Sequence, residues 1–162
     1  MSVEIVKEYL KKWNKDKDVR EFEESSATVE LAAQAVGVIP ARIAKTLSFL
    51  SKDGVHCSLV VAAGDAKVDN SKYKRFFGCK AKMLSPEEVV SYTGHAVGGV
   101  CPFANPEGKV NTYLDESLRR FETVFPAAGS ASSAVEMTCE ELYLCGNAKG
   151  WIDVCKGWQE EA

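Results

Sequence analysis

A lysine at the head of a largely apolar segment is the first residue whose type and position could do chemistry. Lys45 precedes the segment Thr46–Leu50, which is typical of a β-strand. A strand would hold the ammonium group of Lys45 at one end, where a cation can bind an anionic or carbonyl group of a ligand. The alternative interpretation is an ordinary solvated lysine at a strand end.

The second candidate is a loop, predicted to span 94–106, that contains two adjacent glycines. Gly98 and Gly99 have no side chain, so a ligand could approach the main chain closely. Exposed N–H groups in such a loop can bind a carbonyl oxygen or an oxyanion, although a tight turn would have the same composition. The loop lacks the glycine–lysine ending of a phosphate-binding loop. The small residues at 127–134 could likewise form the floor of a cavity or a flexible loop.

Cys101 and His95 are the residue types that a cysteine hydrolase uses as nucleophile and base. They are six residues apart in one loop, and the sequence shows no third group that would orient the histidine. The sequence therefore gives little support to Cys101 as a nucleophile. A hydrolase built on Cys101 stays open as an alternative.

The six cysteines are expected to be dispersed and mostly buried free thiols. None stands in a C-x-x-C pair, and no histidine has zinc-finger spacing from two of them. We therefore predict neither a metal site nor a disulfide framework. The N-terminal segment lacks the apolar run of a secretory signal, which predicts a reducing, cytoplasmic environment. No segment approaches the roughly 20 apolar residues of a membrane span.

The overall charge excludes a partner held by global basicity. The 162 residues include 20 Lys or Arg and 23 Asp or Glu, which gives a formal net charge of −3. One segment, 67–82, is nevertheless basic and contains a single acid, Asp69. It could be a solvated helix face or a patch that contacts phosphates. Its basic residues are Lys67, Lys72, Lys74, Arg75, Lys80 and Lys82.

Short helices and strands that alternate irregularly must position these candidates. Helices are predicted at 2–13, 28–36 and 69–77, a helical turn at 115–119, and two more helices begin at the capping-box patterns 85–88 and 138–141. Strands are predicted at 45–50, 55–61, 79–83, 109–114, 123–126, 135–137 and 151–154, and 15–24 is predicted to be a solvated connection. The pattern predicts one mixed α/β domain over 1–162, in which helices flank a strongly curved, mixed β-sheet.

Five short motifs together resemble the YbaK/EbsC-type proteins and the editing domain that is inserted in bacterial prolyl-tRNA synthetases. They occur in the order of that family and cover about 25–155, nearly the whole chain. The motifs are AKTL (44–47), GDAKVD (64–69), TGHAVGGVCPF (93–103), LDESL (114–118) and AG (128–129).

This resemblance implies a barrel-like sheet and a free-standing trans-editing enzyme. Such enzymes hydrolyse the ester that joins a wrong amino acid to the 3′ adenosine of a tRNA, most often the tRNA for proline. The essential lysine of the family matches Lys45, and its substrate-binding loop matches Gly98, Gly99 and Pro102. The family uses no protein nucleophile, metal or cofactor.

The predicted substrate site and RNA patch extend these matches to neighbouring residues. The expected partners are the 3′ acceptor end of an aminoacyl-tRNA and, by the same resemblance, prolyl-tRNA synthetase. The substrate site adds Val100, Cys101, Phe103, Gly129 and Ser130, and the nucleic-acid patch consists of Lys67, Lys72, Lys74 and Arg75.

One departure from the family pattern bears on the amino acid that is removed. Relatives that remove cysteine carry a hydroxyl residue just before the glycine of the late loop and an acid a few residues after it. The corresponding positions here are Ala127 and Ala134, which argues against a cysteine substrate. A binding module of the same fold, which holds tRNA or an aminoacyl-adenosine without hydrolysing it, is the alternative function.

Overall fold

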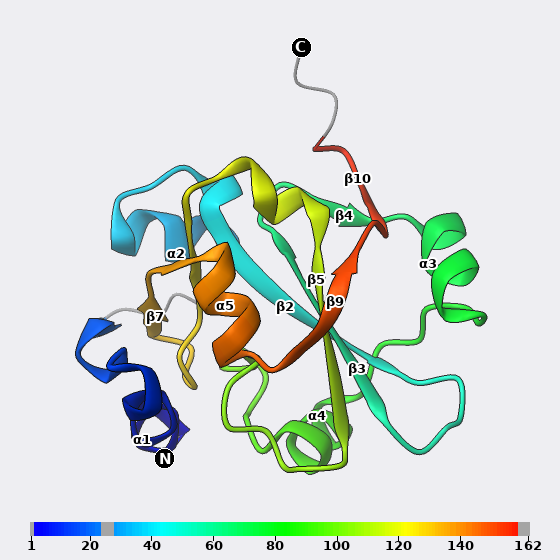
Figure 1. Cartoon of the computed structure of the whole chain (residues 1–162), viewed down its shortest axis with the longest axis horizontal. Helices are drawn as coiled ribbons and strands as arrows, with labels where there is room; N and C mark the ends of the chain where they lie inside the picture. Colours follow the sequence, from blue (N-terminus) through cyan, green and yellow to red (C-terminus); the bar gives the residue numbers. More distant parts are fainter. Residues whose placement is uncertain (1, 24–27, 159–162) are drawn as a thin grey trace.

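Six strands form one curled sheet in the order β8-β6-β2-β3-β5-β9 (Figure 1). The computed structural model describes residues 2–23 and 28–158. Strands β2 and β3 form an antiparallel hairpin, whereas β3, β5 and β9 run parallel, so the sheet is mixed as predicted. The strands are β2 (Ile43–Leu50), β3 (Cys57–Ala63), β5 (Val110–Asp115), β6 (Thr123–Pro126), β8 (Met137–Thr138) and β9 (Ala148–Ile152).

Helices and two small ribbons surround this sheet (Figure 1). The ribbons pair β1 (Val19–Glu21) with β7 (Ser133–Val135), and β4 (Lys67–Val68) with β10 (Cys155–Lys156). The α-helices are α1 (Ser2–Leu10), α2 (Val29–Val36), α3 (Asn70–Phe77), α4 (Pro86–Thr93) and α5 (Cys139–Cys145). The described residues also form the 3₁₀ turns η1 (Lys11–Trp13), η2 (Asp16–Asp18), η3 (Pro40–Arg42) and η4 (Glu116–Arg120).

The most apolar predicted strand lies in the middle of the sheet. Every residue of β3 is buried, because β2 and β5 pair with its two edges and side chains cover both of its faces.

The helices begin and end at the capping residues that the sequence predicts. Ser85 and Thr138 each complete a capping box, Thr28 and Asp69 each accept a bond at the start of a helix, and Gly37 and Gly78 end α2 and α3 with positive φ.

Three strand predictions are corrected by the structure. The segment 79–83 forms only an isolated bridge between Phe49 and Met83, because its backbone meets β2 at single hydrogen bonds rather than along a ladder. The predicted connection 15–24 contains β1, whose backbone pairs with β7. The predicted strand 135–137 is divided at Glu136 between β7 and β8, which belong to different sheets. Residues 24–27, where the family-like region begins, lie outside the described residues.

All six cysteines are free thiols, and four of them are buried. No helix in the described part of the chain is long and apolar enough to cross a membrane. Within residues 2–23 and 28–158, no three His, Cys, Asp or Glu side chains group in a way that could hold a metal ion.

Candidate active site

A cavity of about 420 Å³ lies beside strand β2, between α2, α4 and two loops. Its lining is mostly aliphatic, and Met83 and Val97 on its rim are each about 60 % exposed. The polar side chains of the lining are Thr28, Lys45, Thr46, Ser48 and Ser133. The cavity can therefore enclose a small apolar group next to a single cation.

Lys45 reaches the cavity from β2 and is held by backbone carbonyl groups. Its ammonium group donates to the carbonyl oxygens of Gly64 and Ala66, the first at 3.4 Å. Because an ammonium group has three N–H donors, one remains for a ligand. Burial lowers the pKa of Lys45 from its usual value, while Asp65 and the Cys155 thiol oppose this shift. Partial burial also strengthens the attraction of this cation for an anionic or carbonyl group.

The segment that holds Lys45 is itself fixed by an ion pair. Asp65 lies between the two carbonyl acceptors, and its carboxylate accepts two hydrogen bonds from Arg120, at 2.6 and 3.0 Å. This contact lowers the pKa of Asp65. The ammonium position is therefore set by η4 as well as by the sheet.

The glycine loop contributes two residues with unused backbone donors to the lining of the same cavity. Gly98 and Val100 both line the cavity, and neither N–H group donates to an acceptor among the described residues. The N–H of Gly99, which lies between them, is used inside the loop, where it donates to Ala96 at 2.9 Å. Two unbonded N–H groups and one cation thus adjoin one small, largely apolar space.

Gly99 holds the glycine loop against the late loop of small residues. A Cβ atom at this position would lie 2.7 Å from the carbonyl oxygen of Gly129 and 2.8 Å from the Cα atom of Ser130. The absence of a side chain therefore permits the contact. Gly129 and Ser130 are outside the cavity lining, so the structure places them behind the loop that they were predicted to join.

The late loop is held in shape by Ser133. Its hydroxyl group accepts from the N–H groups of Ala128 and Ser130, at 3.1 and 3.2 Å, and donates to the carbonyl of Ser130. Ala127 and Ala134, the two positions at which the sequence departs from cysteine-removing relatives, both line the cavity. No hydroxyl or acid from these two positions enters the space.

Cys101, Pro102 and Phe103, which were also predicted to bind the substrate, lie outside the lining of this cavity. Cys101 and Phe103 are completely buried in the core, and Pro102 lines a second cavity. Gly98 and Val100 thus line the first cavity, whereas Cys101 and Phe103 pack in the hydrophobic core.

Cys101 and His95 are close together but cannot act as a nucleophile and base. The Cys101 sulfur is 3.6 Å from Nε2 of His95. That nitrogen is also 2.8 Å from the carbonyl oxygen of Phe103, to which it must donate its hydrogen, so it cannot accept the thiol proton. Burial raises the pKa of Cys101 to about 12 and lowers the pKa of His95. Both shifts disfavour a thiolate–imidazolium pair.

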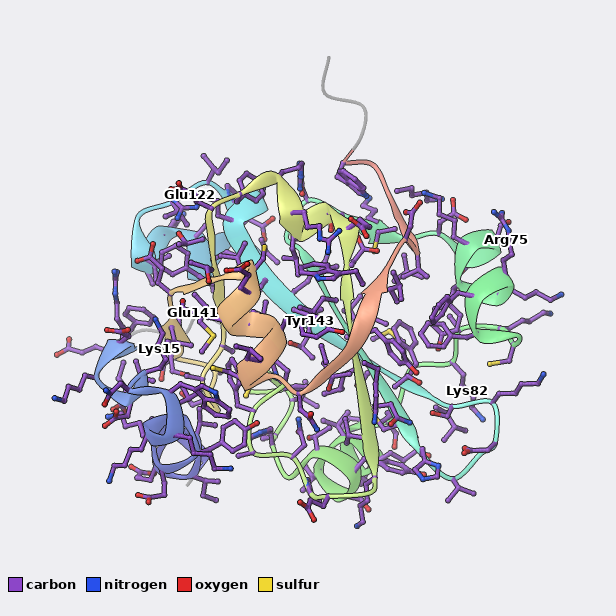
Figure 2. All side chains as sticks on the ribbon, viewed as in Figure 1. Lys15, Arg75, Lys82, Glu122, Glu141 and Tyr143 are labelled. Carbon is purple, nitrogen blue, oxygen red and sulfur yellow. The ribbon has the colours of Figure 1, made fainter. Side chains whose placement is uncertain are left out.

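The basic segment lies mainly on α3 and on the strand before it. Figure 2 shows Arg75 and Lys82 extending outward on the same side of the molecule. Lys72 already has partners: it pairs with Asp153 at 3.0 Å and donates to the carbonyl of Cys155. Lys74 and Arg75 have no ion pair with any described residue. The positive charge of Lys67 helps to lower the pKa of Lys45.

Several cavity residues were not predicted from the sequence. Met83, Leu84 and Val89 contribute apolar lining from α4 and the segment before it, and Thr46 contributes a buried hydroxyl with no partner in the described residues. Apolar cavity walls have the same composition as packed cores, so only their position in the fold identifies them. A usable signal was the AKTL motif, since Thr46 is adjacent to Lys45.

Comparison with known proteins gives consistent results. The model of the aminoacyl-tRNA editing domain family matches residues 23–143, well over half of the chain. The uncharacterized protein YwhH of Bacillus subtilis is 54 % identical over 162 residues, which cover 98 % of this chain and 100 % of YwhH. A proline–tRNA ligase of Thermotoga neapolitana is 30 % identical over 95 residues, 58 % of this chain and 16 % of the ligase.

A solved structure agrees with the sequence relatives. It was described as a proposed trans-editing enzyme for prolyl tRNA synthetase, and it matches with a TM-score of 0.85 and 31 % identity over 96 % of this chain and 98 % of that one. Sequence and fold therefore lead to the same group of proteins, and the chain belongs to the aminoacyl-tRNA editing domain family.

Proposed function

We propose that this protein is a free-standing trans-editing deacylase, which hydrolyses the ester between a small wrong amino acid and the 3′ adenosine of tRNA(Pro). The observation that carries the proposal is the cavity beside β2, where Lys45 adjoins the unbonded N–H groups of Gly98 and Val100. The proline–tRNA ligase relative and the solved neighbour support tRNA(Pro) as the RNA and prolyl-tRNA synthetase as a partner. Charged tRNA is met in the cytoplasm, where we place the reaction.

The two N–H groups would hold the ester carbonyl and stabilise the oxyanion. When water attacks the carbonyl carbon, its oxygen gains negative charge, which backbone N–H donors from Gly98 and Val100 can stabilise without reorganisation. Collapse of this intermediate breaks the bond to the ribose oxygen, which takes a proton as it leaves. The proton that the water loses reaches this ribose oxygen by way of the substrate's own 2′-hydroxyl or amino group, so the mechanism needs no protein base.

Lys45 would orient the terminal adenosine through the one N–H that it does not donate to Gly64 or Ala66. An aminoacyl ester is already reactive, so fixing its position beside a water molecule lowers much of the barrier. The aliphatic cavity would receive the amino-acid side chain. Since one methylene is worth only ~1–3 kcal/mol in such a pocket, its size would favour small residues such as alanine, serine or threonine.

A panel of mischarged tRNAs tests the proposal directly. The protein should deacylate at least one of Ala-, Ser-, Cys- or Thr-tRNA(Pro), and Lys45→Met, which keeps an aliphatic stem, should lose at least about 100-fold in rate. Lys17→Ala removes an exposed lysine outside the cavity and should leave the rate unchanged. Unfolding curves establish that Lys45→Met is folded.

Two results would contradict the proposal. Full activity of Lys45→Met on every deacylated tRNA would exclude the role of the ammonium group. Tight binding of tRNA(Pro) by the wild-type protein, with no deacylation of any mischarged form, would instead indicate the binding module.

A further inference from the structure

A second cavity, of about 640 Å³, lies on a different part of the molecule from the Lys45 site. It is lined by the end of α1 and η1, the loop 102–108, the start of β5, the segment that joins α5 to β9, and His56 before β3. Figure 1 shows α1, the lower end of α5 and the loop before β5 gathered in the lower part of the molecule. The cavity is larger than the first one, and no step of the proposed deacylation uses it.

Two lysines give this cavity its charge. Lys12 and Lys149 both line it and are exposed, and neither forms an ion pair within residues 2–23 and 28–158. The lining contains one carboxylate, that of Glu107. The two ammonium groups are therefore available for an anion. Such an anion would neutralise the positive charges of Lys12 and Lys149.

Amide side chains provide the second kind of chemistry. Asn105, Asn111 and Asn147 all line the cavity. Asn105 donates to the carbonyl of Cys101 at 3.2 Å, whereas the side-chain amides of Asn111 and Asn147 make no hydrogen bond with any described residue. An amide presents donor and acceptor together, which is the pattern that the edge of a nucleobase requires.

Aromatic rings provide a third kind of group for binding a ligand. Tyr9 and Trp13 line the cavity, and their ring centroids are 5.2 Å apart. The Lys12 ammonium group lies over both rings, 4.8 Å from the Tyr9 centroid. Tyr9 is fixed because its hydroxyl donates to the carbonyl of Cys145 at 2.6 Å. A base can stack on such rings while its phosphate meets the adjacent lysine.

The backbone around the cavity is held in conformations that need support. Three described residues other than glycine have positive φ, and two of them, Ala104 and Asn147, line this cavity. The left-handed region is unfavourable for an alanine, and such residues are concentrated at binding sites. Gly146, next to Asn147, packs directly on Pro102. The cavity wall is thus a built structure.

We propose that this second cavity binds a nucleotide, with its phosphate at Lys12 and Lys149 and its base among Asn111, Asn147 and the aromatic rings. Cationic, amide and aromatic groups around a space of this size match phosphate, base edge and base face together. The nucleotide is either free or part of an RNA strand. This proposal does not depend on deacylation, because it concerns a cavity that excludes Lys45.

Nuclear magnetic resonance of the whole ¹⁵N-labelled chain tests the site, because its side chains carry their own signals. Titration with AMP and CMP should move the Trp13 indole and the Asn111 and Asn147 amide signals saturably. Adenosine alone and inorganic phosphate alone should each bind more weakly than AMP. Lys12→Ala with Lys149→Ala should weaken AMP at least about 10-fold. A trinucleotide that binds tighter than AMP would identify the ligand as RNA, and equal binding would identify a free nucleotide.

The matched control removes the same number of positive charges elsewhere on the molecule. Lys11→Ala with Lys17→Ala, two exposed lysines outside this cavity, should leave AMP affinity unchanged. The proposal is overturned if no Trp13 or asparagine signal moves, if shifts occur only around Gly98 and Val100, or if both double variants lose affinity equally. Deacylation by the wild-type protein is scored separately, so failure of either proposal leaves the other intact.

Discussion

The buried Cys101 thiol provides the sharpest test at the scale of single residues. Its pKa of about 12 and its position outside the Lys45 cavity predict that it packs and does not react. Cys101→Ala should therefore keep the deacylation rate of the wild type while losing about 1–2 kcal/mol of stability, since it leaves a small void in the core. Deacylation assays and urea unfolding measure the two effects.

A thiol-blocking reagent provides the control for this residue. Cys79 and Cys139 are the more accessible thiols, so the reagent should modify them first and leave deacylation intact. Loss of all activity in Cys101→Ala, with folding preserved, would support the cysteine-hydrolase alternative and contradict the role assigned to Lys45.

At the scale of elements, the contact between two loops predicts a large effect from one methyl group. In Gly99→Ala the new Cβ would meet the backbone of Gly129 and Ser130 at 2.7–2.8 Å, so the loops must separate. Because Gly98 and Val100 would move with Gly99, we expect deacylation to fall about 10- to 100-fold. Gly150→Ala adds a methyl group in β9, where nothing lies within 4 Å, and should be neutral. Equal rates for both variants would contradict the role of the loop contact.

The turn between β2 and β3 predicts a specific dependence on pH. Backbone N–H groups of Val55 and His56, together with the His56 ring, lower the pKa of Asp53 from 3.8 to about 2. A carboxyl with a lowered folded pKa adds stability above its ordinary pKa and loses it as the pH falls toward the folded value. The advantage of wild type over Asp53→Asn in urea unfolding should therefore shrink between pH 3.8 and about 2. A constant difference across this range would exclude the effect.

Local signals in the sequence predicted most of these elements, whereas long-range contacts decided the others. Capping boxes at Ser85 and Thr138 identified α4 and α5, and the Asp-Gly turn identified the central hairpin. Strand β1 and the ribbon of β4 with β10 exist only through distant partners, so nothing near them in the sequence predicts pairing. The site residues divide in the same way between local signals and long-range contacts. Lys45 and Gly98 were predicted, but the burial of Phe103 depends on how the loop folds over the core.

At the scale of the whole molecule, charge is distributed unevenly. The net charge of −3 includes several basic residues whose charge is already used, as in the pairs of Lys72 with Asp153 and Arg120 with Asp65. Lys74 and Arg75 on α3 form no ion pair among the described residues, and Arg75 projects outward in Figure 2. If α3 contacts tRNA, the contact is therefore small, because few cations are available on it.

Salt dependence of tRNA binding measures the size of that contact. Each phosphate that a cation neutralises adds about 0.7–0.9 to the slope of log affinity against log salt concentration. Lys74→Ala with Arg75→Ala should reduce both the affinity for tRNA(Pro) at low salt and the magnitude of this slope by about 1–2. Lys11→Ala with Lys17→Ala removes the same charge from η1 and η2 and should leave the slope unchanged. An equal change in both double variants would mean that overall charge, rather than α3, attracts the RNA.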